Sequence, residues 1–319
     1  MENKFLVQQL REKIKNVLTP LIDNDYVYLD LPYHANIGDT LIWEGTKEFL
    51  NSLPYKCLYY ASKDTFHYRK LASNVVILLH GGGNFGDLYR LHSEFRRKII
   101  ELYPNNKVII LPQTVYYEDA SLIKGDADFY ASHTNVKICA REQFSYDFLK
   151  KHFKNEVFLI PDMAFFLNLK KYKVAEETDR ILYLKRMDKE LVADTCDGSL
   201  IPVNAEVHDW PTCELQDKKP DYIEKLFYKS YRICRMLGCS DKVLASMENL
   251  KRYFYYRPTY VQTGISFLSP YHTIYTTRLH VLILGLLLDK EIYLINNTSG
   301  KVINYYNTWL SGLGKIKIL

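Results

Sequence analysis

The chain has 319 residues, of which 47% are hydrophobic and 25% are charged, and its formal net charge is +5. This composition excludes intrinsic disorder. The longest apolar run (281–288) is far shorter than the ~20 residues that a membrane-spanning helix needs. The mild positive charge disfavours nucleic-acid binding. Six cysteines without a CxxC pair and an N-terminus without a signal-peptide core predict a cytoplasmic protein with no metal site.

The first half alternates short apolar runs with helical segments. Its N-terminal segment places Leu6, Leu10 and Ile14 on one face, which we expect to dock against its own domain rather than to lie on a membrane. Strands are predicted at 26–32, 57–60, 74–80, 107–113, 136–140 and 156–162, with helices from near Asp39, around 93–103 and over 145–153. Continuous β-branched runs separated by helices indicate a parallel sheet covered on both faces.

The second half follows a polar stretch at 168–179 and predicts a similar unit. It contains a strand at 180–186, helices near 221–237 and 241–255, and a passage at 272–310 that alternates strand and helix. We therefore predict an α/β fold with two domains, residues 1–169 and 170–319, in which the last helix is free to pack back on the first domain. Parallel sheets that face each other leave a cleft at the carboxyl ends of their strands, where ligands bind.

Two polar clusters at predicted strand ends share the pattern N-x-G-D. The first ends at Asp39, which is placed either to cap the following helix or to contact a ligand. The second lies in LLHGGGNFGD (78–87) and ends at Asp87. Its three glycines serve either a tight turn or a close approach of backbone amides to an anion.

Two further clusters carry arginine. Arg141 leaves a strand end and is either a surface ion-pair partner or a guanidinium aimed at a carboxylate or phosphate. Arg278 and His280 lie between an apolar strand and an almost wholly apolar helix, where an unpaired charge is costly. A lone histidine there is usually a core residue, but beside an arginine the pair offers an anion clamp and a proton donor within one turn.

Several common motifs are missing from the sequence. It holds no HExxH, no Ser-His-Asp signature and no Walker loop, so hydrolase and NTPase functions lack support. GGGNFGD does not fit GxGxxG with an acidic residue about 20 positions further on, so a dinucleotide site is not predicted.

In their order along the chain, these clusters resemble the polysaccharide pyruvyl transferase family. The segments that carry the resemblance are NIGD (36–39), GGGNFGD (81–87), PQT (112–114), ARExxS (140–145), PDMAF (161–165), LKRMDKE (184–190), TTRLH (276–280) and KVINYYNTW (301–309). The chain departs from the family at Thr114, where serine is frequent, and at Met163, where proline is frequent. The resemblance implies two Rossmann-like domains arranged as in GT-B glycosyltransferases, and transfer of pyruvate from phosphoenolpyruvate (PEP) to a sugar as a ketal.

The resemblance also implies roles for individual residues. The main donor site maps onto Arg278, Leu279 and His280, and Arg141 maps onto a second donor contact. His280 is the candidate for protonating the enol carbon, and Asp39 or Asp87 is the candidate base for the sugar hydroxyls. The remaining residues expected to line the cleft, against donor or acceptor, are Asn36, Gly38, Gly82, Gly83, Asn84 and Lys301. This scheme requires no cofactor and no metal.

The leading hypothesis is thus a PEP-dependent pyruvyl transferase that acts on a capsule or exopolysaccharide intermediate. The glycan acceptor is either polymeric or lipid-linked, and a peripheral contact with the inner face of the membrane stays open. A GT-B-type nucleotide-sugar glycosyltransferase of polysaccharide synthesis would use the same cleft and is the main alternative. A glycan-binding relative without catalytic activity is the third.

Overall fold

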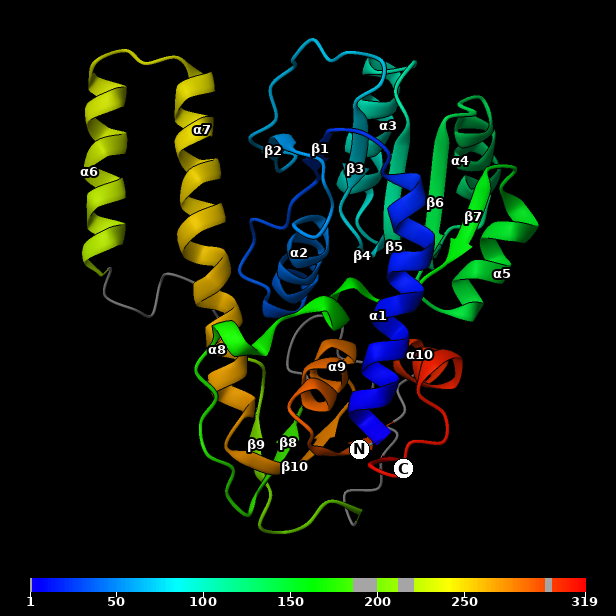
Figure 1. The fold of residues 1–319 in the computed structure, drawn as a ribbon, viewed down its shortest axis with the longest axis vertical. Coiled ribbons are helices and arrows are strands. Elements are labelled where there is room, and N and C mark those ends of the chain that lie inside the picture. Colours follow the sequence, from blue (N-terminus) through cyan, green and yellow to red (C-terminus); the bar gives the residue numbers. More distant parts are fainter. Residues whose placement is uncertain (1, 186–199, 212–220, 296–299) are drawn as a thin grey trace.

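The computed structural model describes residues 2–185, 200–211, 221–295 and 300–319, which form two parallel β-sheets, one above the other in the view of Figure 1. The α/β character and the parallel pairing predicted from the sequence are confirmed. Residues 186–190 of the LKRMDKE motif lie outside the described residues.

The first sheet holds seven strands in the order β2-β1-β3-β5-β6-β7, with β4 paired to β5. The strands are β1 (Tyr26–Leu29), β2 (Cys57–Ala61), β3 (Val76–Leu79), β4 (Gly82–Gly86), β5 (Val108–Tyr116), β6 (Val136–Ala140) and β7 (Glu156–Leu159). They alternate with α2 (Ile37–Leu50), α3 (Arg90–Leu102), α4 (Ser121–Ala131) and α5 (Gln143–His152). Val76 and Leu78 pack into one hydrophobic core while Ile77 and Leu79 pack into another, so both faces of the sheet are covered.

In the part of the chain that the structure describes, the second sheet has five strands in the order β12-β11-β10-β8-β9. They are β8 (Arg180–Leu184), β9 (Glu206–His208), β10 (Tyr271–Thr276), β11 (Glu291–Leu294) and β12 (Ile316–Ile318). Its helices are α8 (Arg257–Leu268), α9 (Leu279–Leu287) and α10 (Lys301–Trp309). Helices α6 (Tyr222–Met236) and α7 (Asp241–Lys251) form a hairpin beside the first sheet, and a π-helical turn at Arg252–Tyr256 joins α7 to α8 (Figure 1).

The connection between the sheets runs through two 3₁₀ turns, Met163–Phe166 and Leu169–Lys171. The domain boundary predicted between residues 169 and 170 falls in this connection and stays a prediction. Helix α10 contacts α5 of the first sheet, and the indole N–H of Trp309 donates to the Arg141 carbonyl at 2.7 Å.

The glycine-rich stretch is a strand where the sequence predicts a loop. Strand β4 runs parallel to β5, with Phe85 opposite Val115 and with its ring buried against Tyr130 and Phe153. Gly86 has a φ of 114°, and a Cβ there would lie 1.8 Å from the Tyr116 carbonyl oxygen. The glycines permit this close pairing because they have no side chain. For the same reason they add nothing to the alternating apolar pattern that predicts a strand.

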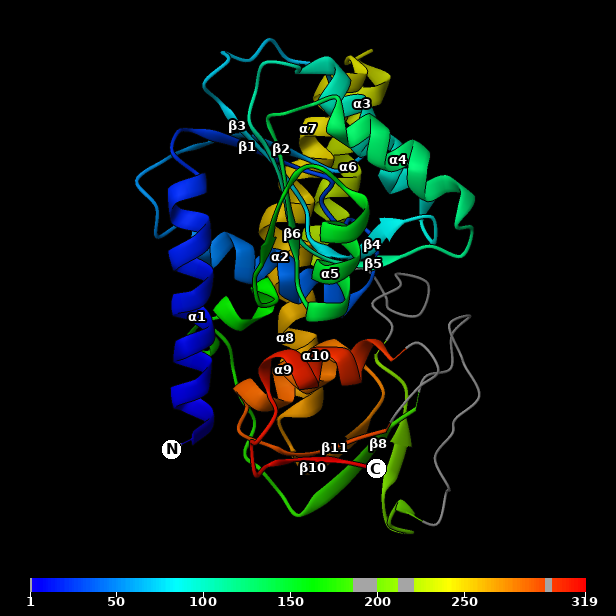
Figure 2. The same ribbon diagram turned by 90° about the vertical axis from the view of Figure 1, so that its right-hand side faces the viewer.

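Helix α1 (Glu2–Leu21) packs its apolar face inward, as predicted, but it covers elements of both sheets (Figure 2). Leu10, Ile14 and Leu18 are buried, and the helix contacts both the Met163–Phe166 turn and α9. The Arg11 guanidinium donates to the carbonyls of Phe165 and Leu167 at 2.7 and 2.9 Å. Among the helices of the described residues, none combines the length and the apolar character that crossing a bilayer requires.

Candidate functional site

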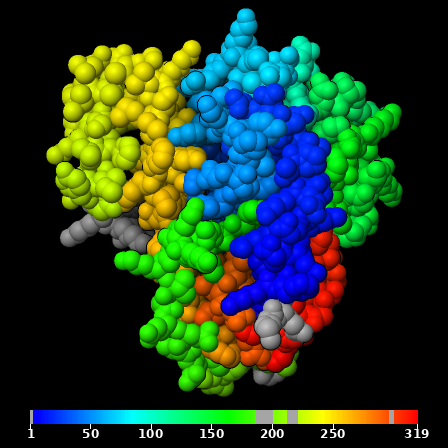
Figure 3. All heavy atoms as spheres, viewed as in Figure 1, coloured from blue at the N-terminus to red at the C-terminus, as the bar shows by residue number. Residues whose placement is uncertain are grey.

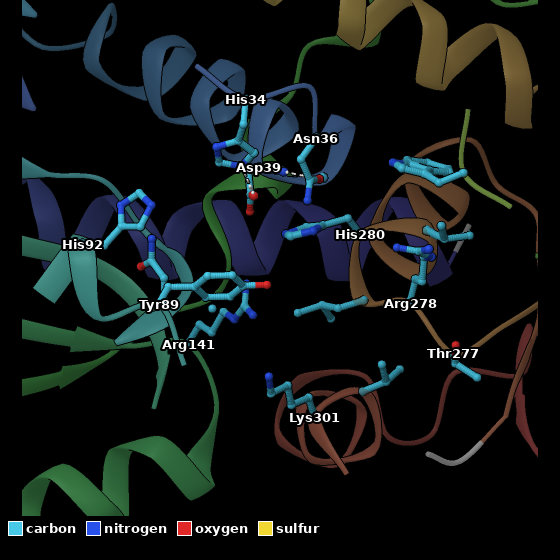
Figure 4. A pocket seen from close by; sticks show the side chains of 17 residues that line it. His34, Asn36, Asp39, Tyr89, His92, Arg141, Thr277, Arg278, His280 and Lys301 are labelled. Atoms are coloured by element: carbon cyan, nitrogen blue, oxygen red, sulfur yellow. Dashed lines mark hydrogen bonds and ion pairs between the residues drawn. The ribbon is translucent and has the colours of Figure 1, made fainter. Parts of the chain in front are cut away.

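A cavity of about 330 Å³ lies where the strands of both sheets end (Figure 4). Its walls come from the segments after β1, β6, β9, β10 and β11, and from β4 itself. The lining residues are His34, Asn36, Gly38, Asp39, Gly83, Asn84, Tyr89, His92, Arg141, Trp210, Thr277, Arg278, Leu279, His280, Val281, Lys301 and Val302.

Helices α2, α9 and α10 begin at this cavity. The first turn of each contributes lining residues, so their positive dipole ends converge on one space. Arg141, Arg278 and Lys301 add three cationic side chains, and among the described lining residues Asp39 is the one that is acidic. The cavity is therefore suited to a small molecule with more than one negative charge.

Arg141 is held in a fixed position at the cavity wall. Its side chain is nearly buried, its Nε donates to Thr114 Oγ1 at 2.7 Å, and its Nη1 donates to Asp162 Oδ2 at 2.9 Å. A Cβ on Gly83 would lie 3.3 Å from Nη2, which places the glycine backbone of β4 directly beside the guanidinium. The third nitrogen thus lies at the wall that β4 forms.

Asp162 joins the two sheets electrostatically. It follows β7 of the first sheet and is 1% exposed, and its Oδ2 lies 3.6 Å from Nε2 of His280, which follows β10 of the second. Burial opposes ionisation of this carboxyl, but the interaction with His280 and the charge of Arg141 prevail and lower its pKa to about 2. An ionised Asp162 therefore faces both the arginine and the histidine.

The His280 ring fits tightly against the first turn of α2. A Cβ on Gly38 would lie 2.4 Å from His280 Nδ1, so only glycine leaves room for the imidazole at that position. Asp162 on one side and the α2 backbone on the other thus fix the ring plane, while the side chain keeps 18% exposure.

Arg278 forms an ion pair at the opposite side of the cavity. Its Nη2 lies 2.5 Å from Asp209 Oδ1, and Asp209 precedes the lining residue Trp210. Its backbone N–H donates to Thr276 Oγ1 at 3.0 Å, at the point where β10 leads into α9. The arginine is therefore oriented before any ligand binds.

His34 and Asp39 form a hydrogen-bonded pair at the cavity mouth. Nε2 of His34 lies 2.8 Å from Asp39 Oδ2. Burial opposes ionisation of Asp39, but this hydrogen bond and the charges of His34 and His280 hold the pKa of the carboxyl well below its usual range. Burial alone would lower the pKa of His34, but the bond to Asp39 outweighs it and raises that pKa.

Asn84 is positioned by a buried network. Asp30, which is 1% exposed, accepts from Arg96 Nε at 3.1 Å and lies 2.6 Å from Nδ1 of His92. Arg96 in turn donates to both the backbone and the side-chain oxygens of Asn84. The buried Asp30 thus positions two lining residues, His92 by direct contact and Asn84 through Arg96.

The structure brings ten of the twelve predicted site residues to this cavity: Asn36, Gly38, Asp39, Gly83, Asn84, Arg141, Arg278, Leu279, His280 and Lys301. Gly82 lies just behind the wall, where a Cβ would be 3.6 Å from Asp39 Oδ1.

The expectation that Asp87 reaches the cavity is corrected, because it is not among the described residues that line it. Its carboxylate accepts from the backbone N–H groups of Glu118 and Asp119 at 2.8 to 3.0 Å, so it shapes the turn after β5. The expected cap of α2 is also corrected. Asn36 is the N-cap, and its Oδ1 accepts from the Asp39 N–H at 3.2 Å.

Sequence reasoning missed several residues of the site: His34, Tyr89, His92, Trp210, Thr277 and the buried Asp162. Asp162 stands at a predicted strand end within PDMAF, and His34 follows another predicted strand. Their positions directly after strands could have identified both as candidate site residues. Within the described ranges, no group of three or more His, Cys, Asp or Glu residues is arranged to hold a metal ion.

Comparisons with known proteins agree on one family. Residues 36–299 match the model of the family described as polysaccharide pyruvyl transferase. The chain is 31% identical to a Bacillus subtilis protein named putative pyruvyl transferase EpsO, over all of this chain and 96% of that one. It is 27% identical to Pyruvyl transferase 1 of Schizosaccharomyces pombe, over 89% of this chain and 69% of that protein.

A solved structure has a similar fold. The crystal structure of a Klebsiella pneumoniae protein of uncharacterised function superimposes with a TM-score of 0.59 and 23% identity. The match covers 97% of this chain and 98% of that one. The likeness therefore extends over both sheets.

Proposed function

The chain belongs to the polysaccharide pyruvyl transferase family, and we propose that it transfers pyruvate from PEP to a sugar of a capsule or exopolysaccharide intermediate. One observation carries the choice of donor. Arg141, Arg278 and Lys301 surround a cavity on which three helix N-termini converge. PEP carries a carboxylate and a phosphate, and each is a group that arginine and helix N-termini bind well.

The two arginines suit the two ends of PEP. Arg141 belongs to the first sheet and Arg278 to the second, so a molecule held by both spans the cavity. Asp162 and Asp209 fix the two guanidinium groups in advance, which reduces the entropy lost when the donor binds.

His280 is the proposed proton donor. It would pass a proton to the methylene carbon of PEP, so that C2 gains positive charge and a sugar hydroxyl oxygen attacks it. The Asp162 carboxylate lies 3.6 Å from Nε2 of His280 and helps to orient the ring for this step. A second sugar hydroxyl then attacks C2, phosphate leaves with the electrons of its C–O bond and takes up the proton of that hydroxyl, and the cyclic ketal closes.

The base for the hydroxyl protons is assigned to the His34–Asp39 pair. A carboxylate with a strongly lowered pKa is a weak proton acceptor on its own, whereas a neutral histidine beside it accepts a proton readily. In this arrangement His34 takes the proton and Asp39 stabilises the resulting imidazolium. The proposed scheme uses no cofactor and no metal.

The test is turnover with PEP and a panel of bacterial glycans, read as phosphate release and as a ketal on the glycan by mass spectrometry. We expect ketal formation with at least one acceptor, and a loss of about 10²- to 10⁴-fold in His280→Gln. His152→Gln, at an exposed histidine of α5, is the matched control and should leave turnover unchanged. Transfer from a nucleotide-sugar without any PEP turnover would contradict the proposal and favour a glycosyltransferase.

A further inference from the structure

The α6–α7 hairpin exposes an unusual amount of apolar surface. It forms the yellow lobe at the upper left of Figure 3, and no residue of α6 is buried. Eleven of the 25 exposed large hydrophobic side chains in the described part of the chain lie on residues 222–254. Such a concentration in about a tenth of the chain marks a surface that contacts something else.

The apolar side chains of α6 form one stripe. Ile223, Leu226, Ile233 and Leu237 are 44%, 52%, 51% and 77% exposed. At 3.6 residues per turn they fall within about 80° of the helix circumference. The face that packs on α7 is a different one, because Phe227 and Tyr231 line a small cavity together with Met247 of α7. The stripe is therefore left facing solvent.

Basic side chains border this stripe along one side. Lys225, Lys229 and Arg232 repeat at spacings of four and three residues on the adjacent face, and Arg235 follows. Residues 222–236 hold these four basic side chains and one acidic side chain, Glu224. Tyr222 and Tyr228 are also exposed on α6. An apolar stripe with lysine, arginine and tyrosine at its borders is the pattern of a helix that lies in a membrane interface.

We propose that the α6–α7 hairpin docks this protein onto a membrane surface that contains anionic lipids, with the α6 stripe (Ile223, Leu226, Ile233 and Leu237) immersed. Each basic side chain near such a surface adds about 1 kcal/mol of attraction. A two-fold dimer built on α6 fits less well, because it would bring the basic rows of two copies together. Helix α1 is not the contact, since its apolar face is buried.

Docking through the hairpin would also orient the cavity. Helix α7 continues through the turn at Arg252–Tyr256 into α8, which packs on α2. A Cβ on Gly264 of α8 would lie 2.7 Å from the Ile37 side chain, so the two helices are in close contact where α2 begins. The hairpin is thus joined through packed helices to a wall of the cavity. The inference does not depend on the proposed reaction.

The test is co-sedimentation of the full chain with vesicles of phosphatidylcholine alone or mixed with phosphatidylglycerol. The native protein should bind the mixed vesicles, and more weakly as salt rises. Leu226→Ser/Leu237→Ser and Lys225→Glu/Lys229→Glu/Arg232→Glu should each reduce binding at least tenfold. Leu91→Ser/Phe144→Ser, at exposed apolar residues of α3 and α5, is the matched control and should bind as the native protein does.

Two results would overturn the proposal. One is failure of the native protein to bind mixed vesicles, or equal binding by the hairpin and control variants. The other is a dimer in sedimentation that Leu226→Ser/Leu237→Ser dissolves while vesicles stay unbound, which would identify a second copy as the partner. The vesicle assay contains no substrate, so its outcome is separate from that of the turnover assay.

Discussion

The cavity and the α6–α7 hairpin are both rich in positive charge, but the arginines are fixed by carboxylates in the cavity, whereas the basic side chains are exposed to solvent on the hairpin. In the cavity, Arg141 is nearly buried and is fixed by Asp162 and Thr114. On the hairpin, Lys225, Lys229 and Arg232 are exposed beside an apolar stripe. Guanidinium groups fixed by buried carboxylates can select the shape of a small anion. Exposed basic side chains instead suit an extended anionic surface, and salt screens them strongly.

Removing the shared carboxylate should have the largest effect on the cavity. Asp162→Asn removes the closer of two buried carboxylates beside Arg141, the other being Glu142 at 3.7 Å, and we expect it to lower the free energy of unfolding by up to about 3 to 5 kcal/mol. It should also weaken PEP binding, because Arg141 and His280 lose a common anchor. Urea unfolding and calorimetry measure the two effects.

A second buried carboxylate provides the control for that change. Asp126 is 3% exposed and pairs with Arg90 and Arg97, and none of the three is among the lining residues of the cavity. Asp126→Asn should also lower stability but should leave PEP affinity unchanged. If both variants change PEP affinity equally, Asp162 has no special position in the site.

The pH dependence of stability should also originate beneath the cavity rather than in the hairpin. Burial lowers the pKa of His80 to about 4, and its Nδ1 lies 2.6 Å from the Tyr28 hydroxyl. Above about pH 6.5 His80 is neutral in both states and contributes no pH dependence. Between pH 6.5 and 4 the unfolded chain takes up a proton that the folded chain does not, so the free energy of unfolding should fall, by about 3 kcal/mol at pH 4.

Urea unfolding at several pH values, on the native protein and His80→Gln, isolates this contribution. The variant should show a flatter profile between pH 6.5 and 4. Parallel profiles for the two proteins would show that His80 is not the group that titrates.

Gly38→Ala should affect turnover more than stability. The new Cβ would lie 2.4 Å from His280 Nδ1, and the ring can swing aside to relieve this contact. A misplaced proton donor should lower turnover by up to about 10²-fold. Gly125→Ala on α4, where a Cβ meets nothing within 4 Å, is the control and should be neutral or slightly stabilising. If Gly38→Ala turned over at the native rate, the position of the His280 ring would not matter for the reaction, and its role as proton donor would be contradicted.

Truncations on the hairpin should have the smallest effect on stability. Leu226→Ala removes a half-exposed side chain and should change the free energy of unfolding by less than about 0.5 kcal/mol. The same change at the fully buried Leu284 of α9 is the matched comparison and should be far more costly. A large loss at Leu226 would mean that α6 is part of a packed core, against the docking proposal.

The sequence predicted which residues meet at the cavity better than it predicted their hydrogen-bond and ion-pair partners. Because parallel strands end at one edge of a sheet, clusters after strands are brought together by topology alone, as Arg141 and Asn84 are. Asp39 and Asp87 share a sequence pattern, yet only Asp39 reaches the cavity, because the Asp87 carboxylate turns to the amides of Glu118 and Asp119. That direction depends on a turn 30 residues away, which no local pattern encodes.

The contact between Asp162 and His280 could not be predicted from the sequence either, because it depends on how the two sheets face each other. Helix α8 was missed because the predicted helix at 241–255 ends inside the π-helical turn at Arg252–Tyr256, after which the chain continues through Pro258. The two helices of the hairpin were predicted, but the solvent exposure of their apolar side chains was not. Amphipathic periodicity indicates an apolar face without saying what covers it.

The most direct test of the proposed donor site is calorimetry of PEP binding to the native protein, Arg141→Gln and Arg278→Gln. We expect saturable binding of one PEP per chain, weakened about tenfold or more by either substitution, because each removes charged hydrogen bonds to the ligand. Leu226→Ser/Leu237→Ser should bind PEP as the native protein does. A native protein that does not bind PEP but binds a UDP- or GDP-sugar, with the same dependence on Arg141 and Arg278, would contradict the proposed donor site.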